Sequence, residues 1–452
     1  MGRIFGTDGM RGIANKDLTC ELAMNIGRAA AAALTSNKHK RPKILIGKDT
    51  RLSSNMLEGA LQAGICSVGA NAALLGVVPT PAVAYLVKKY KADAGIMISA
   101  SHNSYEFNGI KIFDRNGYKL PDKIENRIEE LLEIGFESDK NPIGDKLGNV
   151  STENNAAEDY ILHLKNAVNN NFCGIKVAVD CSNGCACTTA RRLFTGLKAD
   201  CRIIFDSPDG ININDNCGST HLERLSEYVK NNDMDLGIAF DGDADRCLAV
   251  DENGETVNGD TIMAICAMYM KENNLLSKNT VVGTTMTNMG FTDFCEKEGI
   301  KFSSTEVGDR YVLEEMLSKG YNLGGEQSGH MILLDYSTTG DGQLTALWLL
   351  NILHQKKMKL SEISKIVTKY PQSILNLEVS QKQKTEFNCN ENVNKIIFDS
   401  EEKLGDKGRV VIRESGTEPL IRIMVECIDN ILLEEVISDI CIKLNELLKK
   451  LK

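Results

Sequence analysis

The sequence lacks any long apolar run. No stretch approaches the roughly 18 consecutive apolar residues that a membrane helix needs, and residues 1–6 contain no apolar secretory core. Proline is scarce, with 8 residues in 452, and the proportions of hydrophobic (42%) and charged (25%) residues are those of an ordinary globular protein. These absences argue against membrane-spanning, disordered and fibrous classes, so we expect a cytoplasmic protein.

Basic residues are outnumbered by acidic ones. With 52 Lys and Arg against 62 Asp and Glu, the formal net charge is −10. A nucleic-acid partner would require a basic face, so we expect no nucleic acid and no membrane among the partners. A phosphate ligand stays open, because a few local Arg side chains and backbone N–H groups suffice to bind one.

The 14 cysteines lack the paired spacing of a zinc site. The tightest group is Cys181, Cys185 and Cys187, and no second Cys or Cys/His pair stands out as a source of the fourth ligand. Cysteines in a large cytosolic chain are more often reduced and buried. We therefore interpret them as packing residues.

Three segments follow the order strand, polar loop, helix. The strands are residues 43–47, 176–180 and 280–283, with helical patterns beginning near residues 53 and 188 and, in the third segment, ending near residue 299. This order is typical of α/β domains with mostly parallel sheets. The last 80 or so residues instead contain two strands, residues 409–412 and 420–425, before an amphipathic helix at 432–451, which predicts a separate α+β domain. Residues 149–155 and the region of Pro371 resemble linkers.

A serine-rich loop follows the apolar strand at residues 94–98. It has the sequence Ser-Ala-Ser-His-Asn at residues 99–103, and Asn-Gly-Ile-Lys follows at residues 108–111. A serine acts as a nucleophile only with an activating base or with an electrophilic phosphate. The Gly-x-Ser-x-Gly sequence of esterases is not found around it, so an esterase is disfavoured. A plain strand-end turn is the competing interpretation.

Three carboxylates, Asp241, Asp243 and Asp245, follow the apolar run at residues 236–240. Acids this close repel one another unless a cation lies between them, and oxygen ligands suit Mg²⁺. An EF-hand calcium loop is an alternative, since Glu252 falls at its twelfth position. The sixth position is Arg246 where that loop needs Gly, and strand-like runs rather than helices flank the segment.

Three further loops could bind anions or sugars. Residues 413–419 (Arg-Glu-Ser-Gly-Thr-Glu-Pro) could form an anion site from backbone N–H groups, hydroxyls and a guanidinium. Residues 324–330 (Gly-Gly-Glu-Gln-Ser-Gly-His) offer hydrogen bonds to sugar hydroxyls, and His330 could carry a proton near neutral pH. Residues 6–12 place Arg11 beside Gly and Asp. Each loop alone is also compatible with an ordinary turn.

Taken together and in this order, these motifs resemble the α-D-phosphohexomutase family. The matching segments span residues 5 to 419. Residues 5–12 and Gln327 most resemble the phosphoglucosamine branch. Phosphomannomutase/phosphoglucomutase members more often have Met at the position of Gln327. The sequence departs from the family pattern at Ser104, where Pro is usual, and at Cys185 and Cys187, where small residues are usual.

The resemblance implies three similar α/β domains with mixed, mostly parallel sheets, plus a C-terminal α+β domain, around a central cleft. The expected domains are residues 1–150 with a phosphoserine loop, 151–255 with a metal loop, 256–370 with a sugar loop, and 371–452 with a phosphate loop. It also implies one Mg²⁺ per chain, a glucosamine 1,6-bisphosphate intermediate and activator, and a phosphosugar as the small-molecule partner. A single chain and a homodimer both stay open.

By the same resemblance, Ser101 would carry a phosphoryl group and share Mg²⁺ with the three aspartates, and Arg246 would steady the phosphate. The catalytic set would be completed by Lys111, Arg11 and His330, and the substrate-binding set would be His102, Glu326, Ser328, Arg413, Ser415, Gly416 and Thr417. The implied activity interconverts glucosamine 6- and 1-phosphates and supplies UDP-N-acetylglucosamine and cell-wall precursors. The alternatives are a phosphomannomutase/phosphoglucomutase and a non-catalytic phosphosugar sensor.

Overall fold

The computed structural model describes most of the chain. The described residues are 5–6, 9–34, 41–136, 142–168, 170–380, 387, 390–414 and 420–450. None of the helices in this part of the chain has the length and apolarity that a membrane span requires.

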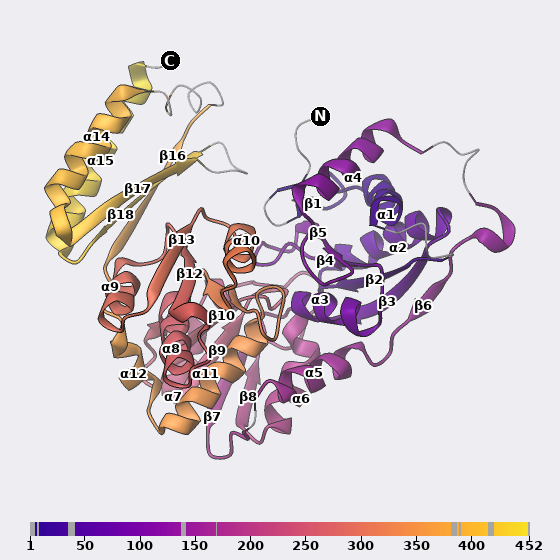
Figure 1. Cartoon of the computed structure of the whole chain (residues 1–452), viewed down its shortest axis with the longest axis horizontal. Helices are drawn as coiled ribbons and strands as arrows, with labels where there is room; N and C mark the ends of the chain where they lie inside the picture. Colours follow the sequence, from indigo (N-terminus) through magenta and orange to yellow (C-terminus); the bar gives the residue numbers. More distant parts are fainter. Residues whose placement is uncertain are drawn as a thin grey trace. The chain divides into compact units, whose positions relative to one another are not determined.

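The first sheet has six strands in the order β1-β5-β4-β2-β3-β6 (Figure 1). Strands β2, β3, β4 and β6 are parallel, while β5 runs antiparallel to β4 and to β1. The strands are β1 (Met10–Ile13), β2 (Lys43–Lys48), β3 (Asn71–Val77), β4 (Ala94–Ile98), β5 (Phe107–Asp114) and β6 (Val150–Thr152). The helices in this segment are α1 (Cys20–Leu34), α2 (Leu52–Ser67), α3 (Thr80–Lys89) and α4 (Asp122–Ile134).

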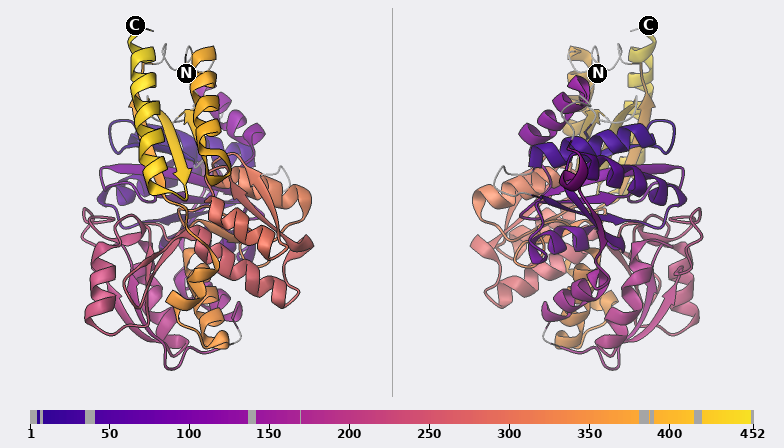
Figure 2. Two further views of the ribbon diagram at one scale, coloured as in Figure 1. Left: turned by 90° about the vertical axis from the view of Figure 1, so that its left-hand side faces the viewer. Right: turned by 90° about the vertical axis from the view of Figure 1, so that its right-hand side faces the viewer.

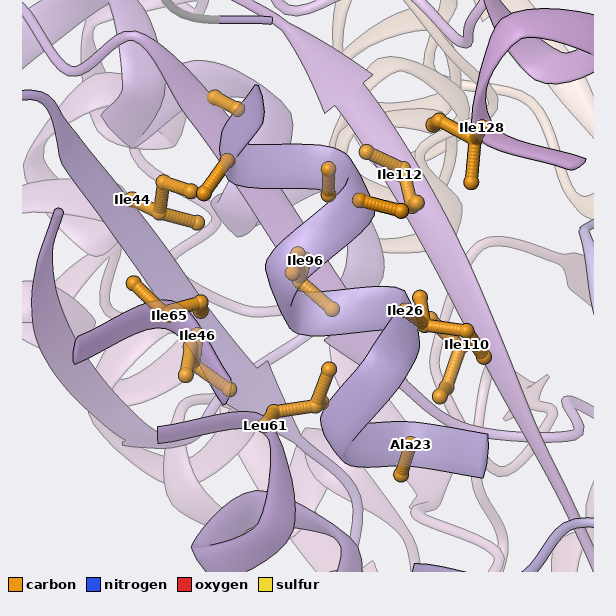
Figure 3. Packing of buried hydrophobic residues seen from close by; sticks show 14 of the residues in the cluster. Ala23, Ile26, Ile44, Ile46, Leu61, Ile65, Ile96, Ile110, Ile112 and Ile128 are labelled. Carbon is orange, nitrogen blue, oxygen red and sulfur yellow. The ribbon is translucent and has the colours of Figure 1, made fainter. Parts of the chain in front are cut away.

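Branched aliphatic side chains form the core between this sheet and its helices. Figure 3 shows isoleucines of β2, β4 and β5 packed against Ala23 and Ile26 of α1 and against Leu61 and Ile65 of α2. Close packing of α1 on α2 depends on small residues, since a Cβ at Gly64 would lie 2.0 Å from the carbonyl oxygen of Met24. Branched residues favour the strands and small residues favour the helix contact, so this part of the sequence specifies its own core.

The second sheet has the order β11-β10-β9-β7-β8. Its strands are β7 (Lys176–Asp180), β8 (Asp200–Ile204), β9 (Leu236–Phe240), β10 (Cys247–Asp251) and β11 (Thr256–Val257), and the helices in this segment are α5 (Ala156–Asn166), α6 (Ala190–Gly196) and α7 (Glu223–Asn231). Strands β7, β8 and β9 are parallel, and β10 returns antiparallel to β9. The loop between β9 and β10 holds the acidic triplet.

The third sheet has the order β13-β12-β14-β15. Its strands are β12 (Thr280–Thr284), β13 (Lys301–Thr305), β14 (Leu323–Gly325) and β15 (Met331–Leu333), with helices α8 (Gly259–Glu272), α9 (Met289–Lys297), α10 (Asp309–Lys319), α11 (Gly342–Lys356) and α12 (Leu360–Ile363) in the same segment. Strand β14 is parallel to β12 and antiparallel to β15. The connection between β14 and β15 carries the predicted sugar loop.

The C-terminal sheet is entirely antiparallel, in the order β16-β18-β17. Its strands are β16 (Gln372–Glu378), β17 (Gly408–Glu414) and β18 (Leu420–Cys427), and the helices α14 (Glu391–Leu404) and α15 (Asn430–Lys450) lie against one face (Figure 2). Alternate residues of β18, including Ile421, Ile423 and Val425, point into the apolar cluster with these helices. The predicted α+β character of this domain is confirmed.

By its internal contacts the chain divides into two compact units. One comprises residues 1–284 and 303–365, and the other comprises residues 285–302 and 366–452. The predicted fold class, α/β domains with mixed sheets followed by an α+β domain, is confirmed.

The predicted linker at residues 149–155 contains β6, an exposed edge strand that pairs with β3. The strand is Val-Ser-Thr with all three side chains exposed, which is too short and too polar to show the alternation of a half-buried strand.

Candidate active site

The serine loop begins where β4 ends, and it meets the acidic loop that begins where β9 ends. Ser101 is fully buried, and its backbone has a φ of 52°, in the left-handed region that non-glycine residues rarely adopt. Its hydroxyl donates a hydrogen bond to Oδ2 of Asp241 over 2.5 Å. Two motifs that are 140 residues apart in the sequence therefore form one site.

The carboxylates of Asp241, Asp243 and Asp245 converge. All three are buried, and one ligand oxygen from each lies within 4.8 Å of the others. Burial, followed by the charges of Asp245 and Asp243, holds the pKa of Asp241 well above its ordinary value. Three acids so placed resist ionising together unless a cation neutralises them.

The two oxygens of Asp243 have different surroundings. Oδ2 accepts hydrogen bonds from the Thr80 hydroxyl at 2.6 Å and from the Lys111 ammonium at 2.8 Å. Oδ1 is buried, and no described residue donates a hydrogen bond to it. An oxygen-only donor set with a buried, unbonded carboxylate oxygen fits a hard cation such as Mg²⁺.

The EF-hand alternative does not fit this loop. The loop lies between β9 and β10, two antiparallel strands of one sheet, and not between helices. Glu252 instead accepts hydrogen bonds from the hydroxyl of Ser361 at 2.5 Å and from its N–H at 3.3 Å. The residue that would have completed a calcium loop therefore has a structural partner elsewhere.

Two arginines, Arg11 and Arg246, lie beside the serine loop, which itself contains His102. The Arg11 guanidinium donates to Oδ1 of Asn103 at 3.0 Å, and the backbone N–H of Arg246 donates to Oδ1 of Asp241 at 3.2 Å. Burial, together with the charges of Arg246 and Arg11, lowers the pKa of His102 to about 4. His102 is therefore neutral near pH 7, and the cationic groups here are guanidinium and ammonium groups.

The predicted sugar loop brings His330 to the acidic triplet. Nδ1 of His330 lies 3.7 Å from Oδ1 of Asp245, and Nε2 accepts the N–H of Gly340 at 3.1 Å. Burial lowers the pKa of His330, but the charges of Asp245 and Asp309 outweigh this effect and raise it overall. Nε2 also lies 3.3 Å from Oδ2 of Asp309, so each ring nitrogen of His330 faces a carboxylate.

Glu326 and Ser328 complete this loop. The carboxylate of Glu326 accepts the N–H of Gly308 at 3.1 Å, and burial, followed by the charge of Asp309, raises its pKa. The hydroxyl of Ser328 is buried, and it has no hydrogen-bond partner among the described residues. A buried hydroxyl left unpaired is suited to a ligand that brings its own donors and acceptors.

Three residues of the site were not assigned from the sequence. Thr80 begins α3 and donates to Asp243, while Arg51 and Asn214 both donate to the backbone carbonyl of Ser101. Arg51 lies in the polar loop after β2, which was identified only as a loop. The sequence shows that Arg51 is a charged residue in a loop at the end of a buried strand. It does not show where the side chain of Arg51 points.

The C-terminal loop can be placed only in part. Arg413 lies in β17, where the antiparallel register pairs it with Arg422 of β18. Arg422 lines a cavity of about 240 Å³ together with Met286, Ile374, Asn376, Val411 and Met424. Ser415, Gly416 and Thr417 lie outside the described residues, as does the side chain of Arg413. Arg422 belongs to none of the motifs identified in the sequence.

Comparison with known proteins gives consistent matches along the chain. Models described as phosphoglucomutase/phosphomannomutase alpha/beta/alpha domains I, II and III match residues 2–138, 158–254 and 258–370, and the corresponding C-terminal domain matches residues 374–443.

Curated relatives and solved structures match over nearly the whole chain. Phosphoglucosamine mutase from Clostridium acetobutylicum is 54% identical over 426 residues, and that from Ruminiclostridium cellulolyticum is 52% identical; both alignments cover 94% of this chain and 95% of the relative. A phosphoglucomutase/phosphomannomutase family protein from Burkholderia thailandensis has a similar structure, with a TM-score of 0.82 at 23% identity, covering 98% of this chain and 97% of that one. At that identity the structural likeness bears on the fold alone.

Proposed function

Because the chain belongs to the phosphoglucomutase/phosphomannomutase family, we propose that it is a phosphosugar mutase that interconverts glucosamine 6-phosphate and glucosamine 1-phosphate. The observation that carries the proposal is the buried Ser101 hydroxyl, 2.5 Å from Asp241 in a triplet of carboxylates. A serine placed against a cation site is what a phosphoryl carrier needs, since phosphoryl transfer depends on positioning and charge neutralisation.

The choice of sugar rests on the relatives. The two curated relatives cited above are phosphoglucosamine mutases at more than half identity over nearly the full chain. Gln327, between Glu326 and Ser328, supports the same assignment. Enzymes that act on mannose and glucose phosphates more often carry Met at this position. Glu326 and Ser328 are the residues that we propose hold the sugar hydroxyls.

The reaction follows from a phosphorylated Ser101. The phosphoserine gives its phosphoryl group to the free 1-hydroxyl of glucosamine 6-phosphate, so the bond from phosphorus to the serine oxygen breaks as a bond to the sugar oxygen forms. The product, glucosamine 1,6-bisphosphate, turns in the site and returns its 6-phosphoryl group to Ser101. Glucosamine 1-phosphate leaves, and free bisphosphate can phosphorylate an empty Ser101, which makes it an activator.

The surrounding residues hold charge and protons. Arg246 and Arg11 neutralise the transferring phosphoryl group, with His102 beside them. Lys111 and His330 handle the proton that leaves or rejoins the sugar hydroxyl. The phosphate that is not reacting binds to Arg413, Ser415, Gly416 and Thr417 of the C-terminal domain.

Asp241, Asp243 and Asp245 would hold one Mg²⁺ together with an oxygen of phosphorylated Ser101. When bound, the ion supplies neutralisation of the negative charge on the phosphoryl group. The fit rests on the buried, unbonded Oδ1 of Asp243 and on the all-oxygen donor set.

Phosphorus NMR of the purified protein with Mg²⁺ tests the proposal. Glucosamine 6-phosphate should convert to glucosamine 1-phosphate with a kcat/KM higher than for the corresponding glucose and mannose conversions. A preference for mannose or glucose phosphate would instead identify a phosphomannomutase/phosphoglucomutase. Binding without turnover of any of the three would identify a sensor and refute the mutase.

A further inference from the structure

The backbone carbonyls of Ser101 and Asn103 converge on the same two donors. Arg51 donates through Nη2 to Ser101 at 3.1 Å and to Asn103 at 2.6 Å. Asn214 donates through Nδ2 to the same two carbonyls, at 2.9 Å each. These donors come from different parts of the chain, since Arg51 precedes α2 and Asn214 lies between β8 and α7.

Both donors are themselves fixed in place. The Arg51 side chain is fully buried and forms an ion pair with Asp49. Asp49 also accepts the backbone N–H of Arg51 at 3.0 Å and the hydroxyl of Ser54 at 2.7 Å. The buried guanidinium therefore has a counter-charge that is held rigidly.

Asn214 is held through its backbone. Its φ of 59° is left-handed, a conformation that asparagine tolerates better than most residues, and its N–H donates to the carbonyl of Ser182 at 2.9 Å. Gly242, within the acidic loop, leaves room for the contact, because a Cβ there would lie 2.6 Å from the Ser101 carbonyl oxygen. The arrangement thus needs glycine at 242 and asparagine at 214.

We propose that Arg51 and Asn214 form a carbonyl clamp, which holds Ser101 in its left-handed conformation and so aims its hydroxyl at Asp241. The catalytic role of the clamp rests on the proposed function, because it requires that Ser101 is the phosphoryl carrier. Both residues donate to backbone carbonyls of the loop, and Arg51 also donates to the Ser99 hydroxyl at 3.3 Å. They act on Ser101 by holding the loop that carries it, so they are positioning residues. A relaxed loop would let the serine oxygen move away from the acidic triplet.

The clamp predicts a specific kinetic signature. The guanidinium of Arg51 and the amide of Asn214 set the position of the Ser101 hydroxyl through the loop backbone, and not the binding of the distal phosphate or the sugar hydroxyls. Loss of one donor should therefore lower kcat by on the order of 10- to 100-fold, because misplacement of a reacting group by about 1 Å has that scale of cost. KM should stay within about twofold of the wild-type value.

Asn214→Gly is the sharpest test, because glycine keeps the left-handed backbone and removes only the donor. Asn216→Gly is the matched control: Asn216 is also left-handed, with a φ of 50°, but it is exposed and its amide donates to Asp215. We expect the kcat loss in Asn214→Gly alone, with both variants folded by circular dichroism. Wild-type kcat in Asn214→Gly, or a KM rise that accounts for the whole loss, would overturn the clamp.

Hydrogen exchange at residues 100–103 without substrate separates this claim from the proposed function. Exchange should be faster in Asn214→Gly than in wild type or Asn216→Gly, whichever sugar the enzyme uses. Unchanged exchange would overturn the clamp even if the mutase activity were established. Absence of wild-type mutase activity would overturn the proposed function, while the exchange result would still decide the clamp.

Discussion

At the scale of single residues, Asp243 divides its two oxygens between two roles. Thr80 and Lys111 bind Oδ2, and the buried Oδ1 is left for a cation. This division would orient the carboxylate for the proposed ion, which is the usual effect of outer-shell hydrogen bonds on a metal ligand. Thr80 would therefore support the proposed metal site without contacting the ion.

Asp243→Asn should weaken Mg²⁺ binding and turnover together. We expect each to fall by more than about tenfold, since a hard anionic ligand becomes a neutral amide. Mn²⁺ binding followed by electron paramagnetic resonance, alongside the Mg²⁺ dependence of turnover, measures both effects. Glu252→Gln is the control, because Glu252 pairs with Ser361. Loss of metal binding in Glu252→Gln, with retention in Asp243→Asn, would show that the ligand assignment is wrong.

Asp341 should make stability depend on pH. It caps α11 by accepting a hydrogen bond from the N–H of Leu344 at 2.9 Å, and it also accepts one from the hydroxyl of Tyr160 at 2.8 Å. Burial raises the pKa of Asp341 to about 6. The unfolded value is about 3.9, so the folded protein holds this proton more tightly. Its stabilising contribution is complete below about pH 4 and is lost as the pH rises through about 6.

Asp341→Asn removes this titration while keeping an oxygen that can accept either hydrogen bond. Between about pH 5 and pH 8 the variant should gain on the order of 1–2 kcal/mol relative to wild type. Thermal unfolding of both proteins at the two pH values measures the difference. A stability gap that does not change with pH would show that Asp341 is ionised throughout.

The candidate catalytic residues could be identified from the sequence because each lies in a short motif, and the structure brings Ser101 and the three aspartates together. Ser101 and the aspartates follow apolar strands, and strand ends in α/β sheets are where ligands bind. Arg51, Asn214 and Thr80 could not be predicted in the same way. Their loops have ordinary turn compositions, and their importance depends on which side chains meet across distant segments.

At the scale of elements, two loops of the second sheet approach each other too closely for side chains. The loop after β7 packs on the acidic loop after β9, with the N–H of Cys185 donating to the carbonyl of Gly242 at 2.8 Å. A Cβ at Gly184 would lie 2.2 Å from that same oxygen. The backbone after β7 therefore supports the segment that carries Asp241 and Asp243.

Gly184→Ala should consequently destabilise the fold and displace the acidic loop. We expect a loss of about 1–3 kcal/mol, the usual cost of overpacking, with a lower affinity for Mg²⁺. Gly59→Ala is the matched control, since Gly59 is exposed within α2 and has no atom within 4 Å of its added Cβ. That change should stabilise by up to about 1 kcal/mol. Denaturant unfolding checks both, and equal stability of the two variants would contradict the close contact.

Elements with apolar strands were predicted with accurate boundaries, as in β7 at Lys176–Asp180 and β9 at Leu236–Phe240. Strand β6 was missed because an exposed edge strand needs no apolar residues. Its pairing with β3 comes from the backbone alone. Hydrophobic patterns record burial, so they cannot identify elements that are not buried.

At the scale of the whole molecule, one proposed step connects the domains, the metal site and the clamp: the phosphoryl group passes through Ser101. The domains, the metal site and the clamp all derive their proposed roles from that step. Two neighbouring serines make the claim specific, since Ser99 accepts the N–H of Ser101 at 3.0 Å and supports the loop, whereas the Ser101 hydroxyl faces Asp241.

The most direct measurement is the mass of the intact protein, with peptide mapping, after incubation with glucosamine 1,6-bisphosphate and then with glucosamine 6-phosphate. We predict one phosphoryl group on Ser101 after the first step and its loss to the sugar in the second. Ser101→Ala should take up none and turn over roughly 10³-fold more slowly or worse, while Ser99→Ala should still be phosphorylated. Phosphorylation at Ser99 or elsewhere, or wild-type turnover by Ser101→Ala, would contradict the account.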